Sequence, residues 1–270
     1  MSRLNGRVAV ISGAARGQGR AHAVRLAREG ADIVAFDICA PLDSPMHPGS
    51  TQEDLAETVA LVEAEGRQCL SARADARDLA AMLDLAKRTE EAFGRLDALI
   101  VNHGIWAIAE NSWKLTEEDW NEGIGVMLTG AWKVTKAFIP NMISAGHGGS
   151  IVLTSSAMGE KAQPGAIAYT AAKHGVLGMM RTLAWELGEH GIRVNALMPG
   201  TIGTRMTQEG GTVEQSSEWW PRFFSTDRAL LQGGWMPPEV IANAAAFLVS
   251  DDAEAITGTA IPVDGGWSAF

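Results

Sequence analysis

The chain of 270 residues contains only two cysteines, a single tyrosine, and fewer basic than acidic residues, 22 against 32. The cysteines, Cys39 and Cys69, are too few for a disulfide framework, and no cysteine or histidine spacing indicates a metal site. The net charge of −10 argues against nucleic acid and anionic membranes as partners. No apolar run approaches the roughly 20 residues of a membrane span, and the N-terminus lacks a signal-peptide core. These absences predict a cytoplasmic protein without a bound metal.

What the sequence does contain is a regular alternation of aliphatic and helix-forming segments. This alternation is typical of a parallel sheet that carries helices on both faces. Strands are predicted at residues 8–12, 33–37, 68–73, 98–102, 150–154, 193–197 and 260–263. Helices are predicted at residues 17–29, 53–65, 78–93, 117–143, 168–190 and 238–249. Because no repeat or linker interrupts the pattern, residues 1–270 are expected to form one α/β domain with a mostly parallel seven-stranded sheet.

A glycine-rich turn, with Gly13, Gly17 and Gly19, separates the first predicted strand from the first helix. Glycines let the backbone turn tightly and approach a pyrophosphate, whose charge is stabilised by the N-terminus of the following helix. Single glycines in a turn say little, but strand, glycine loop, helix and second strand follow one another here in one unit. This order predicts a doubly wound, Rossmann-type domain that binds a dinucleotide.

Asp37 indicates which dinucleotide is bound. It ends the second predicted strand, about twenty residues after Gly17, where a carboxylate can bind both ribose hydroxyls and repel a 2′-phosphate. Arg16, a cation within the loop, would instead favour NADP, because it could bind a 2′-phosphate. Asp37 is expected to lie closer to the deciding hydroxyl, so the sequence predicts NAD as the cofactor.

Tyr169 and Lys173, with Ser156 upstream, are candidate catalytic residues. Residues four apart on a helix share one face, and an ammonium beside a phenol is expected to lower the phenol's pKa from about 10. Such a phenol can take a proton from an alcohol or return one to a carbonyl oxygen. A tyrosine and a lysine one turn apart are common by themselves. The upstream serine and the nucleotide loop favour a dehydrogenase site instead.

Taken together, these motifs resemble the short-chain dehydrogenase/reductase family over essentially the whole chain. The resemblance implies that Ser156 stabilises the substrate oxygen, that Tyr169 is the acid or base, and that Lys173 assists it and binds the nicotinamide ribose. His103 departs from the family's alanine beside Asn102. The implied cofactor-binding residues are Gly13, Arg16, Gly17, Gln18, Gly19, Asp37, Asp75, Asn102, Gly104, Tyr169, Lys173, Pro199, Gly200, Ile202 and Thr204.

Within this family, the Gly13–Gly19 loop and an insertion after Asp37 resemble the carveol-dehydrogenase-like branch. Many members of that branch are linked to the redox peptide mycofactocin and hold NAD without exchanging it. The resemblance therefore implies an external redox carrier as a partner. Relatives also pair their long helices into homotetramers, so a homotetramer is expected.

One position departs from the family pattern. Where the family has asparagine in the middle of the long helix after the fourth strand, this chain has Met127. Methionine is a weak acceptor, so it cannot hold the relay water that links the lysine to solvent in relatives. Either Met127 only fills the space, which we favour, or proton transfer is impaired or specialised.

The substrate is indicated by apolar residues in the variable segments. Residues 204–236 are predicted to form a lid over a hydrophobic substrate, and the predicted pocket comprises Trp106, Met158, Met206, Trp219 and Trp220. Packing against the body of the protein would equally explain any one of these tryptophans. A cyclic or terpenoid secondary alcohol fits best, and a steroid or an aryl ketone is the alternative. A nucleotide-binding scaffold without activity is a third possibility, which only Met127 supports.

Overall fold

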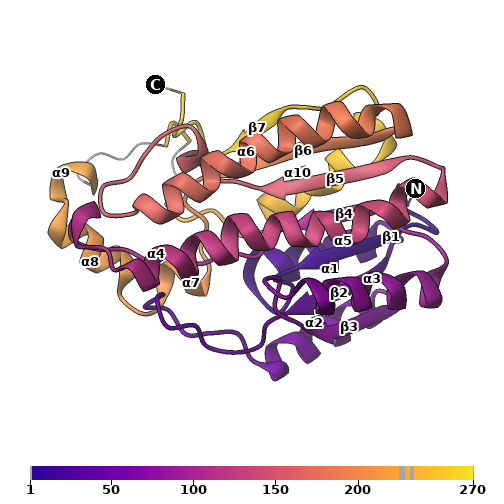
Figure 1. The fold of residues 1–270 in the computed structure, drawn as a ribbon, viewed down its shortest axis with the longest axis horizontal. Helices are drawn as coiled ribbons and strands as arrows, with labels where there is room; N and C mark the ends of the chain where they lie inside the picture. The colour runs from indigo at the N-terminus through magenta and orange to yellow at the C-terminus, as the bar shows by residue number, and fades with distance from the viewer. Residues whose placement is uncertain (1, 225–228, 232–233, 270) are drawn as a thin grey trace.

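Seven parallel strands form one sheet in the order β3-β2-β1-β4-β5-β6-β7. They come from a computed structural model that describes residues 2–224, 229–231 and 234–269 (Figure 1). The strands are β1 (Val8–Ser12), β2 (Asp32–Asp37), β3 (Cys69–Arg73), β4 (Ala98–Val101), β5 (Gly149–Thr154), β6 (Ile192–Pro199) and β7 (Ala260–Val263). All seven predicted strands are confirmed within two residues at each end, and the sheet is entirely parallel.

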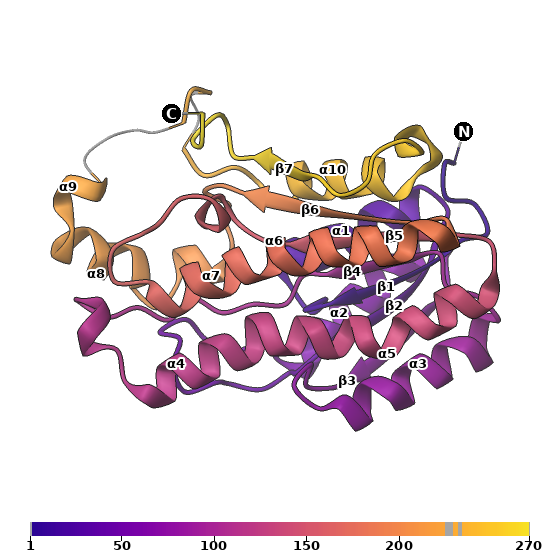
Figure 2. The same cartoon turned by 45° about the horizontal axis from the view of Figure 1, so that its top comes forward.

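Helices cover both faces of this sheet (Figures 1 and 2). The main ones are α1 (Gly17–Arg28), α2 (Gln52–Ala64), α3 (Leu79–Phe93), α4 (Glu117–Ile124), α5 (Gly130–Ala145), α6 (Ile167–Leu187) and α10 (Glu239–Val249). Short 3₁₀ turns are η1 (Ser112–Lys114), η3 (Ala157–Gly159), η4 (Gly188–His190) and η5 (Asp251–Ala253). Local sequence fixes several helix ends. Thr51 and Asp54 form a capping box at the start of α2, and Gly94 ends α3 with a φ of 66°.

The core consists of two apolar layers, one on each face of the sheet. On one face, α3, α5 and α6 contribute buried side chains such as Met82, Phe138 and Met180. On the other face, α1 and α10 contribute side chains such as Leu26 and Ile241. The strands supply both layers, and β1 is buried along its whole length. This explains why its sequence is continuously apolar rather than alternating.

Helical backbone runs through the predicted residues 117–143, but it contains a π turn that the sequence did not predict. The structure has α4, then a π-helical turn η2 (Gly125–Thr129), then α5. A π turn holds one extra residue, and such turns occur inside α-helices, frequently at functional sites. Here Nε2 of His103 lies 3.1 Å from the carbonyl oxygen of Val126 within the turn. Apolar periodicity along the chain cannot reveal such a contact, because its partner lies about twenty residues upstream.

The predicted lid, residues 204–236, is partly helical. It contains α7 (Arg205–Gln208), α8 (Thr212–Trp219) and α9 (Pro221–Phe224), and Figure 1 shows α8 and α9 at one end of the molecule. Residues 225–228 and 232–233 of this segment lie outside the described residues. Gly210 lies against the backbone of Met46 and His47, since a Cβ added to it would come within 2.2 Å of the Met46 carbonyl oxygen. The lid therefore contacts the insertion that follows β2.

Candidate active site

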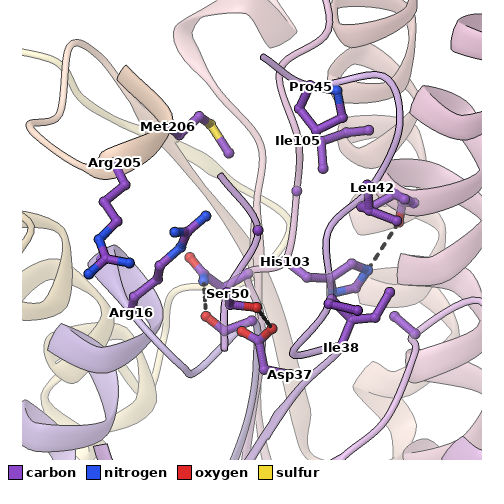
Figure 3. Close-up of a pocket in the computed structure, with 18 of the residues that line it drawn as sticks. Arg16, Asp37, Ile38, Leu42, Pro45, Ser50, His103, Ile105, Arg205 and Met206 are labelled. Atoms are coloured by element: carbon purple, nitrogen blue, oxygen red, sulfur yellow. Dashed lines mark hydrogen bonds between the residues drawn. The ribbon is translucent and has the colours of Figure 1, made fainter. Parts of the chain in front are cut away.

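A pocket opens at the carboxyl ends of β1 to β4, and most of the predicted cofactor residues line it (Figure 3). It encloses about 1020 Å³, counting its open mouth. The lining includes Gly13, Arg16, Gly17, Gln18, Asp37, Asp75, Asn102, Gly104 and Thr204, together with Met206. Ligands of open parallel sheets bind at this edge, where the strand order reverses between β1 and β4. The pocket thus lies beside the glycine loop, where the sequence predicts that a dinucleotide binds.

The glycine loop is shaped by close backbone contacts. A Cβ on Gly19 would come within 1.9 Å of the Gly13 carbonyl oxygen, and one on Gly13 within 2.8 Å of the Cα of His103. Gly13 also has a φ of 65°, which side chains disfavour. No side chain caps the first amides of α1 at Arg16, so these N–H groups can bind an anion. The loop has the shape and the donors that a pyrophosphate requires.

The carboxylate of Asp37 is held firmly at the pocket edge. It accepts hydrogen bonds from the Ala15 N–H at 3.0 Å, the Cys39 N–H at 3.2 Å and the Ser50 hydroxyl at 2.5 Å. In Figure 3, Asp37 and Ser50 point toward each other at the base of the pocket. One oxygen receives two of these donors, and the other receives one. Because each carboxylate oxygen can accept two bonds, Asp37 keeps acceptor capacity for a ribose hydroxyl.

The residues that follow Asp37 were missed as site residues. We define residues 38–51 as the insertion loop. Its lining residues are Ile38, Ala40, Leu42, Pro45, His47, Gly49 and Ser50. Arg16 donates a hydrogen bond to the Pro48 carbonyl, so the arginine holds this loop against the glycine loop. A signal was present in the sequence, since the insertion starts directly after a strand that ends at the cofactor edge.

Asp75 also lines the pocket, but its carboxylate is already engaged. Arg77 donates to it from its backbone N–H at 2.8 Å and from Nη2 at 2.7 Å. Burial alone would raise the pKa of Asp75, but the hydrogen bonds from Arg77 outweigh it and lower this pKa. Adenine recognition by Asp75, which the family resemblance implies, remains a prediction.

The three candidate catalytic residues come together where β5 meets α6. Ser156 caps η3, and its hydroxyl accepts the Met158 N–H at 3.1 Å. A side-chain hydrogen bond joins Ser156 to Tyr169 on α6. One turn further along, Nζ of Lys173 lies 5.6 Å from the centre of the Tyr169 ring and donates to the Thr154 carbonyl at 2.8 Å. Tyr169 and Lys173 follow Ser156 by 13 and 17 positions in the sequence, and the fold brings the three residues to one place.

Burial governs the electrostatics of this group. It raises the pKa of Tyr169, and the hydrogen bond from Ser156 offsets this only in part. Burial also lowers the pKa of Lys173 to about 8. That the charge of Lys173 lowers the pKa of the phenol remains a prediction.

Met127 lies in the π turn beside Lys173. It is 2 % exposed and packs with Ile105, Val126 and Ala172. A Cβ on Gly104 would lie 3.7 Å both from Nζ of Lys173 and from Cγ of Met127. The thioether therefore forms an apolar wall near the ammonium, where relatives are expected to have an amide.

The predicted substrate residues are not all brought together. Met206 lines the cofactor pocket, whereas Trp106, Met158, Trp219 and Trp220 do not. Trp106 is 9 % exposed, and Nε1 of Trp220 donates to the Glu110 carbonyl at 2.7 Å. The latter bond docks the lid on the segment that follows β4.

Six predicted cofactor residues lie outside the lining of this pocket: Gly19, Tyr169, Lys173, Pro199, Gly200 and Ile202. Gly19 packs within the glycine loop, and Pro199, Gly200 and Ile202 follow one another at the end of β6. Gly200 is pressed against Asp264, since a Cβ there would come within 2.7 Å of the Asp264 Cα. Ile202 is buried and pairs with Met236 in an isolated bridge. Among the described residues, no cluster of acidic, histidine or cysteine side chains could hold a metal, and no helix could cross a membrane.

Comparison with known proteins identifies close relatives of this chain. A family model described as enoyl-(acyl carrier protein) reductase matches residues 13–268. An uncharacterized NAD-dependent oxidoreductase of Mycobacterium tuberculosis is 47 % identical over 97 % of this chain and 96 % of its own length. The (−)-trans-carveol dehydrogenase of Rhodococcus erythropolis is 41 % identical, over 98 % of this chain and 99 % of its own. The crystal structure of carveol dehydrogenase from Mycobacterium avium in complex with NAD matches with a TM-score of 0.94 and 42 % identity, over 100 % of both chains.

Proposed function

The chain belongs to the short-chain dehydrogenase/reductase family, and from this premise we propose that it interconverts a hydrophobic secondary alcohol and its ketone, with NAD as the hydride carrier. The alcohol we propose is cyclic or terpenoid, like carveol. The observation that carries the proposal is the convergence of Ser156, Tyr169 and Lys173 beside a pocket that ends at Asp37. This convergence also argues against a scaffold without activity.

NAD fits the residues that are present. The glycine loop and the uncapped N–H groups at the start of α1 can bind the pyrophosphate of NAD. The carboxylate of Asp37 can still accept a hydrogen bond from a ribose hydroxyl. When bound, NAD supplies the hydride acceptor or donor. Thr204 and the backbone near Ile202 are proposed to hold the carboxamide, and Lys173 the nicotinamide ribose.

The protein's own residues then move the proton. Ser156 donates a hydrogen bond to the substrate oxygen and steadies its developing charge. Tyr169 takes the alcohol proton during oxidation and returns it during reduction. Burial raises the pKa of Tyr169, so the phenol holds its proton and can act as the acid in reduction. For oxidation, the charge of Lys173 is proposed to lower the pKa of the phenol so that it can act as the base. Lys173, with a pKa of about 8, can itself pass protons near neutral pH. Apolar residues of the lid are proposed to cover the substrate.

A turnover assay with a panel of cyclic secondary alcohols tests this function. The panel should contain terpenoid alcohols, a steroid and an aryl carbinol, since the last two represent the alternative substrates. An artificial electron acceptor should be included with NAD, because the insertion loop lines the cofactor pocket and an external redox carrier is a proposed partner. We expect the highest kcat/KM for a terpenoid alcohol. No turnover of any alcohol with either acceptor would contradict the proposal.

Replacing Met127 by asparagine is expected to destabilise the protein without raising turnover. The position is 2 % exposed and lined by apolar side chains, so an unpaired amide there should cost about 1–3 kcal/mol. Thermal unfolding and the pH profile of kcat measure the two effects, with Met127→Leu as the apolar control. A rise in turnover with a shifted pH profile would instead show that proton delivery through Lys173 limits the rate.

We also propose that the protein is a homotetramer built on its long helices. Trp132 on α5 is 48 % exposed and Trp185 on α6 is 89 % exposed, which is unusual for side chains of this size. Symmetric association would cover both. Light scattering at micromolar concentration should give four times the monomer mass, and Trp185→Glu should lower it. A monomer in the unmodified protein would contradict the proposal.

A further inference from the structure

His103 lies in the wall of the cofactor pocket, at the carboxyl end of β4, and both of its ring nitrogens have partners (Figure 3). Nδ1 lies 2.7 Å from the hydroxyl oxygen of Ser12, and Nε2 lies 3.1 Å from the carbonyl oxygen of Val126. A carbonyl can only accept, so Nε2 carries the hydrogen. Burial and the charge of Lys173 lower the pKa of His103 to about 4, so the ring is neutral at neutral pH. Nδ1 must then accept the hydroxyl hydrogen of Ser12.

The Ser12 end of this bridge belongs to the nucleotide loop. Ser12 is fully buried and directly precedes Gly13. Its hydroxyl oxygen accepts the Asn102 N–H at 2.8 Å and the His103 N–H at 3.3 Å. With its hydrogen given to Nδ1, the hydroxyl uses its full capacity of one donor and two acceptors. Another tautomer of His103 would break this arrangement.

The Val126 end belongs to the wall beside the candidate catalytic lysine. Val126 lies in the π turn, and the next residue is Met127. Gly104, the residue after His103, lies between Met127 and Lys173. A Cβ added to Gly104 would be 3.7 Å from Cγ of Met127 and 3.7 Å from Nζ of Lys173. The fit around the ring is also tight, because a Cβ on Gly130 would lie 3.0 Å from Nε2. His103 therefore spans from the start of the glycine loop to the enclosure of Lys173.

We propose that His103 is a positioning residue whose single neutral tautomer ties the glycine loop to the π turn and so holds the wall around Lys173. No chemical step is assigned to the imidazole itself. π turns are rare and occur frequently at functional sites, and here the Nε2 bond is a side-chain contact that reaches the turn from outside the helix. Through this tie, a change that orders the glycine loop also orders the residues that surround Lys173. This inference rests on the proposed role of Lys173, but its structural part can be tested without a substrate.

Three variants of His103 separate the two hydrogen bonds. His103→Asn can keep the acceptor toward Ser12 but cannot reach Val126. His103→Gln can keep the donor toward Val126 but offers Ser12 no acceptor at the same place. His103→Leu keeps comparable bulk and removes both bonds. His174→Leu is the matched control, because Nδ1 of His174 also bonds a carbonyl, that of Thr170, but on the exposed face of α6.

Amide hydrogen exchange and NAD release are the readouts that do not depend on turnover. We expect His103→Leu to raise exchange in residues 13–19 and in residues 125–130, and to release NAD about tenfold faster. His103→Asn should raise exchange mainly in residues 125–130, and His103→Gln mainly in residues 13–19. If His103→Leu folds poorly, Ser12→Ala tests the loop end while the ring stays in place.

The pH profile of turnover adds a readout that a purely packing role would not move. If the residues around Lys173 loosen, water reaches its ammonium, and the pKa of Lys173 should rise from about 8 toward its ordinary value of 10.5. The part of the pH–rate profile that depends on the titration of Lys173 should then shift to higher pH. The other charges that act on His103 are those of Asp37 and Asp75, and the substitutions leave both in place. Unchanged exchange and NAD release in a folded His103→Leu, or equal loosening in all three variants, would overturn the proposal. Inactivity toward every alcohol would count against the proposed function and leave the exchange result to decide the role of His103.

Discussion

Replacing Tyr169 by phenylalanine is expected to lower turnover by about 10²–10⁴-fold, the range typical of a general acid–base group. The substitution keeps the ring that packs beside Ala172 and Met127 and removes only the hydroxyl. Because this is the only tyrosine in the chain, no other phenol can replace it. The measurement is kcat with saturating alcohol and bound NAD, and NAD affinity should change little by comparison.

The matched control for this experiment is Thr170→Val. Thr170 is the next residue on α6, and its hydroxyl oxygen is buried without a hydrogen-bond partner among the described residues. Removal of that hydroxyl should leave turnover within a few-fold of the unmodified protein. Full activity in Tyr169→Phe would refute the assignment of Tyr169 as the acid or base. A loss of equal size in both variants would show a general effect of altering this turn of α6.

Replacing Asp37 by alanine is expected to weaken NAD binding about 10- to 100-fold and to improve the relative use of NADP. A hydrogen bond from a ribose hydroxyl to a carboxylate is a charge-assisted bond, worth about 1.5–3 kcal/mol, and the same charge repels a 2′-phosphate. The substitution also frees the Ala15 and Cys39 N–H groups and the Ser50 hydroxyl, so the insertion loop should loosen. The measurement is the ratio of kcat/KM for NAD and NADP, together with the dissociation rate of NAD.

Two comparison variants separate charge from geometry at this position. Asp37→Asn has no charge but keeps one acceptor oxygen, which can still receive the Cys39 N–H and the Ser50 hydroxyl, although not the Ala15 N–H. It should therefore shift the cofactor ratio while the bond to Ser50 keeps the insertion loop in place. Asp32→Ala removes a carboxylate at the opposite end of β2, where it pairs with Arg67, and should leave the ratio unchanged. Equal use of both cofactors by the unmodified protein would contradict the assignment of Asp37 as the discriminating residue.

The sequence by itself determined the sheet and the outline of the site. Strand positions could be predicted because a strand buried on both faces must be apolar along its length, as β1 is. The glycine loop could be predicted because close backbone contact excludes side chains, as at Gly19. Tyr169 and Lys173 could be paired because their spacing on one helix fixes their relative direction.

Only the tertiary structure decided how these parts act on one another. The raised pKa of Tyr169 reflects its burial in the folded protein, and no residue spacing encodes burial. The bond from His103, two residues after β4, to the π turn depends on two segments that meet only after the sheet has formed. The insertion loop became part of the pocket because Arg16 and Asp37 hold it there through Pro48 and Ser50. Periodicity and motifs reflect the local structure of each segment. Solvent exclusion and long-range hydrogen bonds arise only when distant segments pack together.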